Sequence, residues 1–220
     1  DAEYQRKFDI ALRKNIVAIY RKGDDFLGNW STDITPQNQR RTIKGFQAEE
    51  GSFNQYQYNH QKAPIEVEVG DIVKYNIRVC NEGKYATKIQ KVIDYIPATG
   101  LELLENGWED GKHTVTYSGY KVTKMDPKNG KPIQIIIEPT NQDAIKSTLK
   151  GTNAVGVTKP DCLDITLEFR VTEEAKGRII TNIAEVAEFK GQEDENGDGN
   201  GEGPWKQVTD CDSTPNNIKL

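Results

Sequence analysis

Apolar and polar residues alternate with a period of two along much of this chain, and this alternation restricts the fold to β-sheet. Successive side chains of a strand point to opposite faces, so the alternation gives each strand one apolar and one polar face. Val73 to Cys80 shows the pattern most clearly. We expect strands at residues 8–20, 65–69, 73–80, 89–96, 114–117, 119–123, 133–138, 163–171 and 179–189.

Helical periodicity is confined to residues 141–151. Asn141 is a potential N-cap, Ile145 and Leu149 are spaced four apart, and Gly151 follows as a stop signal. Eight or more short strands with polar turns and almost no helix are typical of a β-sandwich. We therefore predict an all-β protein, a β-sandwich with long insertions and at most one short helix.

The chain contains 220 residues, and its composition changes twice along its length. Residues 27–60 are polar and rich in Gln, Asn and Gly, which indicates an insertion. Residues 191–220 are rich in Gly and acidic residues and read as a loop, a short edge strand and a linker. We therefore expect one sandwich domain over residues 1–190, followed by this tail. Because residue 1 is Asp and not Met, we expect an excised piece of a longer protein.

The formal net charge is −5 at pH 7, and no basic stripe is available to neutralise phosphates. This balance argues against a nucleic-acid partner. No apolar run approaches the length needed to cross a bilayer, so we expect no membrane contact by this segment. The cysteines, Cys80, Cys162 and Cys211, form no CxxC pair. In the expected strands, Cys80 and Cys162 both point away from the core. One disulfide and three free thiols fit the sequence equally well.

Three of the expected strands place a single polar residue on an otherwise apolar face. These residues are Lys14, Asp94 and Asn182, from an early, a middle and a late strand. A charged or polar group buried without a partner is costly, so each of these side chains must either find a polar partner or reach solvent. The residues that share their faces are Phe8, Ile10, Leu12, Ile16, Ala18 and Tyr20 for Lys14, Val92 and Ile96 for Asp94, and Ile180, Ala184 and Val186 for Asn182.

These residue types form a reactive set. A desolvated lysine loses its proton and becomes a nucleophile. A desolvated aspartate stays protonated and can polarise the asparagine carbonyl. Attack on that carboxamide would release ammonia and leave an amide bond between two side chains, in a core that excludes water. Two simpler interpretations are open: Lys14 extends to solvent at the sheet edge, or the trio is hydrogen-bonded without a covalent bond.

Four segments resemble a known family: FDIALRK (8–14), HQKAPIEVEVGDIVKYNIRVCNEG (60–83), KVIDYIPATGLEL (91–103) and ITNIAEV (180–186). They are similar to repeat domains of Gram-positive, especially clostridial, cell-surface proteins, which are related to isopeptide-forming adhesin and pilin domains. The resemblance implies an immunoglobulin-like sandwich in which Lys14 and Asn182 are cross-linked and Asp94 catalyses the bond. The insertion at 27–60 and Cys80 within a strand depart from the family pattern.

The tail contains a second candidate site. Asp194, Asn196 and Asp198 have the D-x-N-x-D-G spacing that supplies oxygen ligands to calcium. The twelfth position is Trp205 instead of the glutamate of an EF-hand, so the loop is not an EF-hand loop. A solvated acidic turn is the alternative. The cross-link itself requires no cofactor, which leaves calcium as the one candidate cofactor.

We therefore expect a structural stalk or adhesin module of a bacterial cell-surface protein, stabilised by an autocatalytic Lys–Asn isopeptide bond. Its location would be extracellular, at the cell surface or cell wall. Its partners would be neighbouring domains of the same protein and a host ligand or glycan. No enzymatic turnover is expected, because His60 and His113 belong to no recognisable triad or metal motif.

The alternative function is a carbohydrate-binding β-sandwich module of an extracellular enzyme. Trp30, Trp108 or the tyrosines around Tyr56 would then form the sugar platform. A binding module should lose glycan retention when one tryptophan is removed, whereas a stalk module should show no retention to lose.

Calcium in the tail would protect the tail from proteases. If Asp194, Asn196 and Asp198 bind the ion, chelation should increase limited proteolysis near Gly197 while the sandwich stays folded. Identical cleavage patterns with and without chelator, followed by mass spectrometry, would remove the calcium site.

Overall fold

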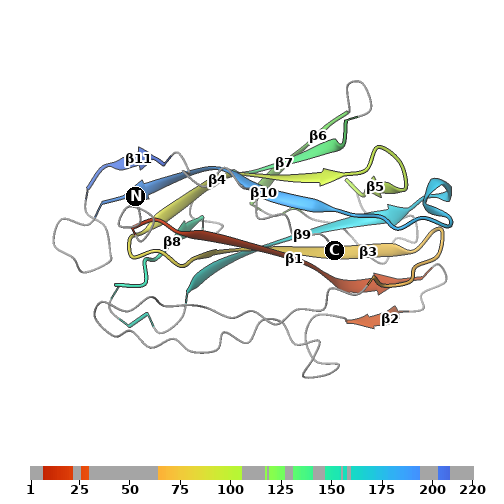
Figure 1. Cartoon of the computed structure of the whole chain (residues 1–220), viewed down its shortest axis with the longest axis horizontal. Helices are drawn as coiled ribbons and strands as arrows, with labels where there is room; N and C mark the ends of the chain where they lie inside the picture. The colour runs from red at the N-terminus through yellow and green to blue at the C-terminus, as the bar shows by residue number, and fades with distance from the viewer. Residues whose placement is uncertain are drawn as a thin grey trace.

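The computed structural model describes residues 7–21, 26–29, 64–105, 117, 119–126, 131–140, 147–154, 156–157, 160–193 and 203–208. Two antiparallel sheets pack face to face in this part of the chain (Figure 1). In order across the first sheet, its strands are β2 (Phe26–Asn29), β1 (Ile10–Tyr20), β3 (Ile72–Asn81), β9 (Asp161–Val171) and β5 (Leu101–Leu103). In the same way, the second sheet contains β11 (Trp205–Gln207), β10 (Ile183–Gln192), β4 (Thr87–Ile96), β7 (Ile133–Pro139) and β6 (Tyr120–Met125).

The strand order is that of an immunoglobulin-like sandwich. In such domains one sheet has the order A-B-E-D and the other contains C, F and G. Here β1, β3, β9 and β5 take the A, B, E and D places, and β4, β10 and β11 take the C, F and G places. The hairpin of β6 and β7 widens the second sheet beside β4. The expected all-β, immunoglobulin-like fold is confirmed.

The inner faces of the two sheets form one apolar core. It is built from the apolar positions of the alternating strands, as the sequence pattern predicts. Its fully buried side chains include Ile19, Ile77, Val79, Ile89, Ile96, Ile135, Ile137, Leu149, Ile165, Leu167 and Phe169.

The expected helix at residues 141–151 is wrong where the structure describes it. Thr148–Leu149 form a short strand, β8, that pairs with the beginning of β4, and the Ile89 amide donates to the Ser147 carbonyl at 2.8 Å. Ser147 and Leu149 are buried while Thr148 is exposed, which is a period of two. The only helical turn in the described part of the chain is a 3-10 turn at Glu173–Ala175.

Three other strand expectations need correction or lie outside the described residues. The expected strand at 65–69 is not formed, since residues 65–68 belong to no strand and a turn follows at 69–70. The Asp71 carboxylate accepts a hydrogen bond from the Glu68 amide (2.8 Å), and Gly70 has a φ of +94°. The expected strand at 114–117 lies outside the described residues except for Tyr117. The last long strand begins at Ile183, four residues later than expected at 179.

A β-bulge divides the first strand into two halves. The pairing of β1 with β3 shifts between Ile16 and Ala18, so Val17 is an extra residue on β1. The bulge reverses the alternation beyond it. Ile19, expected on the outer face, is therefore fully buried in the core, and the face shared with Lys14 ends at Ile16.

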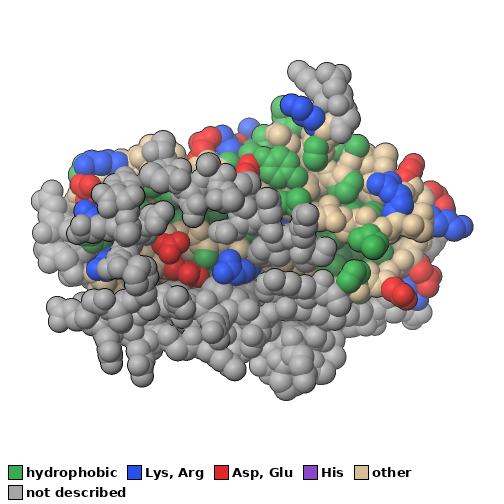
Figure 2. All heavy atoms as spheres, viewed as in Figure 1, with side chains coloured by type: hydrophobic (Ala, Val, Ile, Leu, Met, Phe, Trp, Pro, Cys, Tyr) green, Lys and Arg blue, Asp and Glu red, His purple; other side chains and the backbone are tan. Residues whose placement is uncertain are grey.

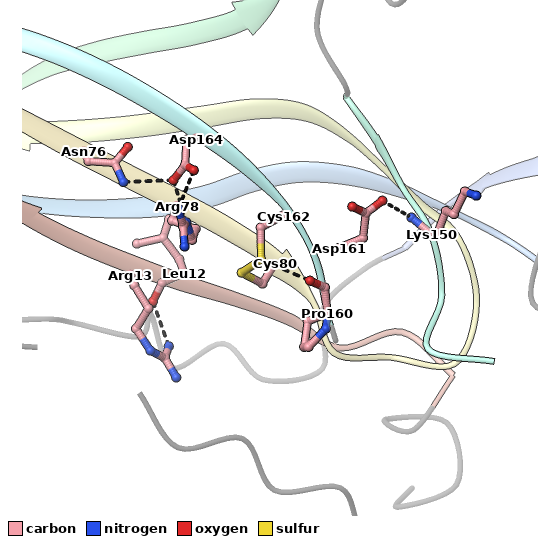
Figure 3. Close-up of a disulfide and its surroundings, with 10 residues drawn as sticks. All are labelled: Leu12, Arg13, Asn76, Arg78, Cys80, Lys150, Pro160, Asp161, Cys162 and Asp164. Atoms are coloured by element: carbon pink, nitrogen blue, oxygen red, sulfur yellow. Dashed lines mark hydrogen bonds and ion pairs between the residues drawn. A yellow bond between two sulfur atoms is a disulfide. The ribbon is translucent and has the colours of Figure 1, made fainter. Parts of the chain in front are cut away.

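A disulfide joins Cys80 of β3 to Cys162 of β9, which lie directly opposite each other in the sheet (Figure 3). The adjacent Val79 and Leu163 face the core, so the disulfide lies on the outer face, as the strand pattern predicts. Arg78 and Asp164 form the next pair, with two hydrogen bonds of 2.6 Å. The third cysteine, Cys211, lies outside the described residues.

Acidic and basic side chains lie interspersed over the described part of the face shown in Figure 2. No helix among the described residues is long and apolar enough to cross a membrane.

The disulfide should contribute to stability mainly by restricting the unfolded chain, since its cysteines are 82 residues apart. We expect the double substitution Cys80→Ala, Cys162→Ala to lower the free energy of unfolding by about 4.5 kcal/mol, measured with urea. The far-UV spectrum should still be that of a β-sandwich. Loss of the folded state in the double variant would mean that the disulfide is the main covalent constraint.

Candidate functional site

The structure brings Lys14, Asp94 and Asn182 together between the two sheets. Lys14 comes from β1 of the first sheet, Asp94 from β4 of the second, and Asn182 immediately precedes β10. All three side chains are buried, with 1% exposure or less for each residue. Three residues far apart in sequence therefore share one site in the core.

Asp94 contacts both of the other residues. Its Oδ1 accepts a hydrogen bond from Lys14 Nζ, which also makes an ion pair. Its Oδ2 accepts a hydrogen bond from Asn182 Nδ2 at 3.3 Å. The carboxyl group of Asp94 thus bridges the amine and the carboxamide.

The carbonyl oxygen of Asn182 is the unsatisfied group of the site. Asn182 Oδ1 is buried and accepts no hydrogen bond from the described residues. Buried polar atoms are seldom left without a partner, and each one that is needs an explanation such as a catalytic role. A purely structural, hydrogen-bonded trio leaves this oxygen unexplained.

Apolar residues surround the trio and exclude water. Lys14 is directly opposite Ile77 of β3, and Ile77 is opposite Ile165 of β9; both isoleucines are buried. Asp94 is directly opposite Ile135 of β7, which is fully buried as well. The alternative in which Lys14 extends to solvent is wrong, because its side chain has no exposed surface.

Burial shifts the pKa of both charged groups. It lowers the pKa of Lys14 to about 8, although the charge and the hydrogen bond of Asp94 act in the opposite direction. It raises the pKa of Asp94, against the effect of Lys14 and of the Asn182 hydrogen bond. The two pKa values move toward each other, which reduces the cost of moving a proton from Lys14 to Asp94.

Tyr75 belongs to the site, although sequence reasoning did not select it. Its ring centroid lies 4.8 Å from Lys14 Nζ. Burial, and then the charge of Asp94, raise the pKa of Tyr75, so the phenol is neutral. The alternation in residues 73–80 places Tyr75 on the apolar face. Any core tyrosine would have the same position, so the sequence does not mark this one as part of a site.

The other expected sites fall outside the described residues. This holds for the calcium ligands Asp194, Asn196 and Asp198. It also holds for the aromatic residues of the sugar platform, Trp30, Tyr56 and Trp108, and for most of the 27–60 insertion. Within the described ranges, no group of three or more His, Cys, Asp or Glu side chains is placed to hold a metal ion.

Comparison with family models and with curated protein sequences gives no match. Among solved structures, the chain is similar to a pilus backbone from Streptococcus pneumoniae, with a TM-score of 0.39 and 13% identity, over 84% of this chain and 53% of the pilus protein. The chain thus spans about half the length of that protein.

Two cohesins give further similarities. The seventh ScaB type I cohesin from Pseudobacteroides cellulosolvens has a TM-score of 0.36 and 15% identity, over 64% of this chain and 77% of the cohesin. The sixth cohesin from scaffoldin B of Acetivibrio cellulolyticus, solved in complex with a Cel5 dockerin, has a TM-score of 0.31 and 11% identity, over 66% of this chain and 92% of the cohesin.

The ion pair predicts a strong energetic coupling between Lys14 and Asp94. Lys14→Ala should lower the free energy of unfolding by at least about 3 kcal/mol, because it leaves a carboxyl group buried without its partner. All variants are compared in the Asn182→Ala background, where no cross-link can form. There the double variant Lys14→Ala, Asp94→Ala should cost less than the sum of the two single variants, measured by urea unfolding.

Lys74→Ala is the matched control, since Lys74 pairs with Glu168 (3.1 Å) on the partly exposed outer face of β3. It should change stability little. Additive effects of the two core substitutions would contradict the coupling.

Proposed function

We propose that this chain is a structural stalk or adhesin module of a bacterial cell-surface protein, stabilised by an intramolecular isopeptide bond between Lys14 and Asn182. Asp94 catalyses the formation of this bond. The observation that carries the proposal is the meeting of an amine, a carboxyl group and a carboxamide in a dry core, with Asp94 in contact with both partners.

The proposed reaction begins with transfer of a proton from the Lys14 ammonium to the Asp94 carboxylate. The neutral amine attacks Asn182 Cγ. A bond forms between Lys14 Nζ and Asn182 Cγ, and the bond between Cγ and Nδ2 of Asn182 breaks. The attacking nitrogen gives a proton to the leaving nitrogen, which departs as ammonia. Asp94 keeps the proton taken from Lys14, so neutral ammonia is released and no charge remains in the core.

The unsatisfied oxygen of Asn182 fits this sequence of steps. While Asp94 is ionised, it accepts from the Asn182 amide nitrogen, as observed. Once it is protonated, Asp94 becomes a donor and binds best to a carbonyl oxygen, which Asn182 Oδ1 supplies after rotation of the carboxamide. That hydrogen bond stabilises the negative charge that develops on the oxygen during attack.

A bond between the first and the last long strands suits a protein that carries tension. It would connect β1 with the start of β10 across the core, so that a pull on both ends would pass through the bond and not through the hydrogen bonds between strands. By analogy with disulfides, closing so long a loop would stabilise the fold by about 5 kcal/mol.

The rest of the proposal concerns the context of the module. The Cys80–Cys162 disulfide supports an extracellular location, because such bonds persist in oxidising compartments. The module would comprise residues 1–190, with 191–220 as an acidic loop, edge strand and linker. Its partners would be neighbouring domains of the same surface protein and a host ligand or glycan. The module modifies itself once and turns over no substrate.

The mass of the intact protein tests the bond directly. Under denaturing conditions, the wild-type chain should be lighter than its sequence mass, corrected for the disulfide, by one ammonia. Fragmentation after proteolysis should give a branched peptide that joins the segments around Lys14 and Asn182.

The variants separate the roles of the three residues. Lys14→Ala and Asn182→Ala should show the full mass and a sharply lower melting temperature. Asp94→Ala should keep both partners unjoined, because nothing polarises the carboxamide. A wild-type chain of full mass, or an Asp94→Ala chain that loses ammonia at the wild-type rate, would refute the mechanism.

A further inference from the structure

The aromatic ring of Tyr75 lies against the amine of Lys14, 4.8 Å from ring centroid to Nζ. We propose that Tyr75 is a positioning residue of the cross-linking reaction, whose ring face holds Lys14 Nζ beside Asp94 and Asn182 in the unreacted protein. This inference rests on the proposed function, since it concerns how the same bond forms.

The ring of Tyr75 is itself held in a fixed place. Tyr75 is on the inner face of β3, directly opposite Ile16 of β1 and Leu167 of β9. It packs edge to face against Phe169, with ring centroids 5.7 Å apart and an interplanar angle of 78°. Phe169 is fully buried. A ring enclosed in this way can fix a flexible lysine side chain, which would otherwise have many rotamers.

The ring offers the kind of contact that the reaction needs. Its face attracts the ammonium group through the cation–π interaction. A second carboxylate in this place would bind the ammonium more strongly and would oppose loss of its proton. The ring instead holds the nitrogen before proton transfer and attracts the neutral amine less, so the lone pair is free to reach Asn182 Cγ.

The proposed role belongs to the ring and not to the hydroxyl group. Burial and the charge of Asp94 raise the pKa of the Tyr75 phenol, which keeps the hydroxyl neutral. A neutral phenol in this place is a poor general base. Phenylalanine should therefore replace Tyr75 with little loss, whereas an aliphatic residue should not.

The pH dependence of bond formation reports on the ring. Among the described residues, the titratable side chains that face Lys14 are Asp94 from β4 and Tyr75 from β3, and the residue before β10 contributes the neutral Asn182. The reactive pair of Lys14 and Asp94 holds one proton, which lies on Asp94 when the amine attacks. The rate should therefore be bell-shaped in pH. Its falling limb should lie near pH 8, where the pair loses this proton.

Removing the Tyr75 ring should shift the falling limb of the rate–pH profile. The ring stabilises the ammonium form, so an aliphatic replacement lowers the pKa of Lys14 further. We expect the falling limb to shift to lower pH by about one unit. We also expect the maximal rate to fall by at least about tenfold, because the amine is no longer held in line with its target.

The experiment follows ammonia loss from unreacted chains. Each chain is purified in urea with its disulfide oxidised, checked for full mass, and diluted into buffers from about pH 5 to about pH 10. Tryptophan fluorescence records folding in the same samples, and intact mass records the bond. The variants are Tyr75→Phe and Tyr75→Leu, with Tyr75→Met as a second variant without a ring should Tyr75→Leu not fold.

Phe189→Leu is the matched control, since it removes a buried aromatic ring from β10 that makes no ring contact with Lys14. This substitution should lower stability and leave the falling limb of the rate–pH profile at the wild-type pH. In the Asn182→Ala background, where no bond forms, nuclear magnetic resonance of the Lys14 ammonium should show the same downward shift of its titration when Tyr75 is replaced by leucine or methionine.

The outcomes separate the two proposals. A wild-type chain that never loses ammonia refutes the proposed function. If wild type loses ammonia and the ringless variants keep its rate and its pH limb, the bond stands and the role of Tyr75 is refuted. The role of Tyr75 is also refuted if Tyr75→Phe is as slow as Tyr75→Leu, or if Phe189→Leu moves the limb as far.

Discussion

The buried ion pair between Lys14 and Asp94 is the interaction on which the centre of this sandwich depends. It places two charges between sheets in a core that is otherwise mainly apolar, so neither charge tolerates loss of its partner. Desolvation disfavours the charged form of each group and brings the two pKa values closer together. The same burial that makes the pair costly for stability makes proton transfer within it easy. In the proposed reaction, this ion pair is replaced by a neutral amide bond.

The sequence predicts the burial of the three polar residues, because a strand gives each residue only two faces. A single polar residue on an apolar face is therefore a strong signal, and it correctly placed Lys14, Asp94 and Asn182 in the core. The same rule predicted that Cys80 and Cys162 share the outer face, but it does not give strand order. The disulfide follows from the position of β3 beside β9, which the alternation does not predict.

The failures also have physical causes. Leu149 matched a helical spacing by chance, since two positions four apart are equally compatible with a strand of period two. Ile19 was placed on the wrong face because a bulge at Val17 has no sequence signature of its own. Tyr75 was overlooked because its role depends on a lysine in another strand. Pairwise contacts across a sheet are not encoded in the alternation of either strand.

The bulge in β1 has a consequence for the fidelity of folding. Lys14 faces Asp94 only if β1 pairs with β3 in one register, since a slip by one residue would turn Lys14 outward and Arg13 or Asn15 inward. The bulge at Val17 makes the two halves of the strand inequivalent, so a slipped strand would misplace both Lys14 and Ile19. The proposed chemistry would then act as a proofreading step, because only chains with a correctly aligned first strand would be sealed, and misaligned chains would stay open to unfolding and degradation.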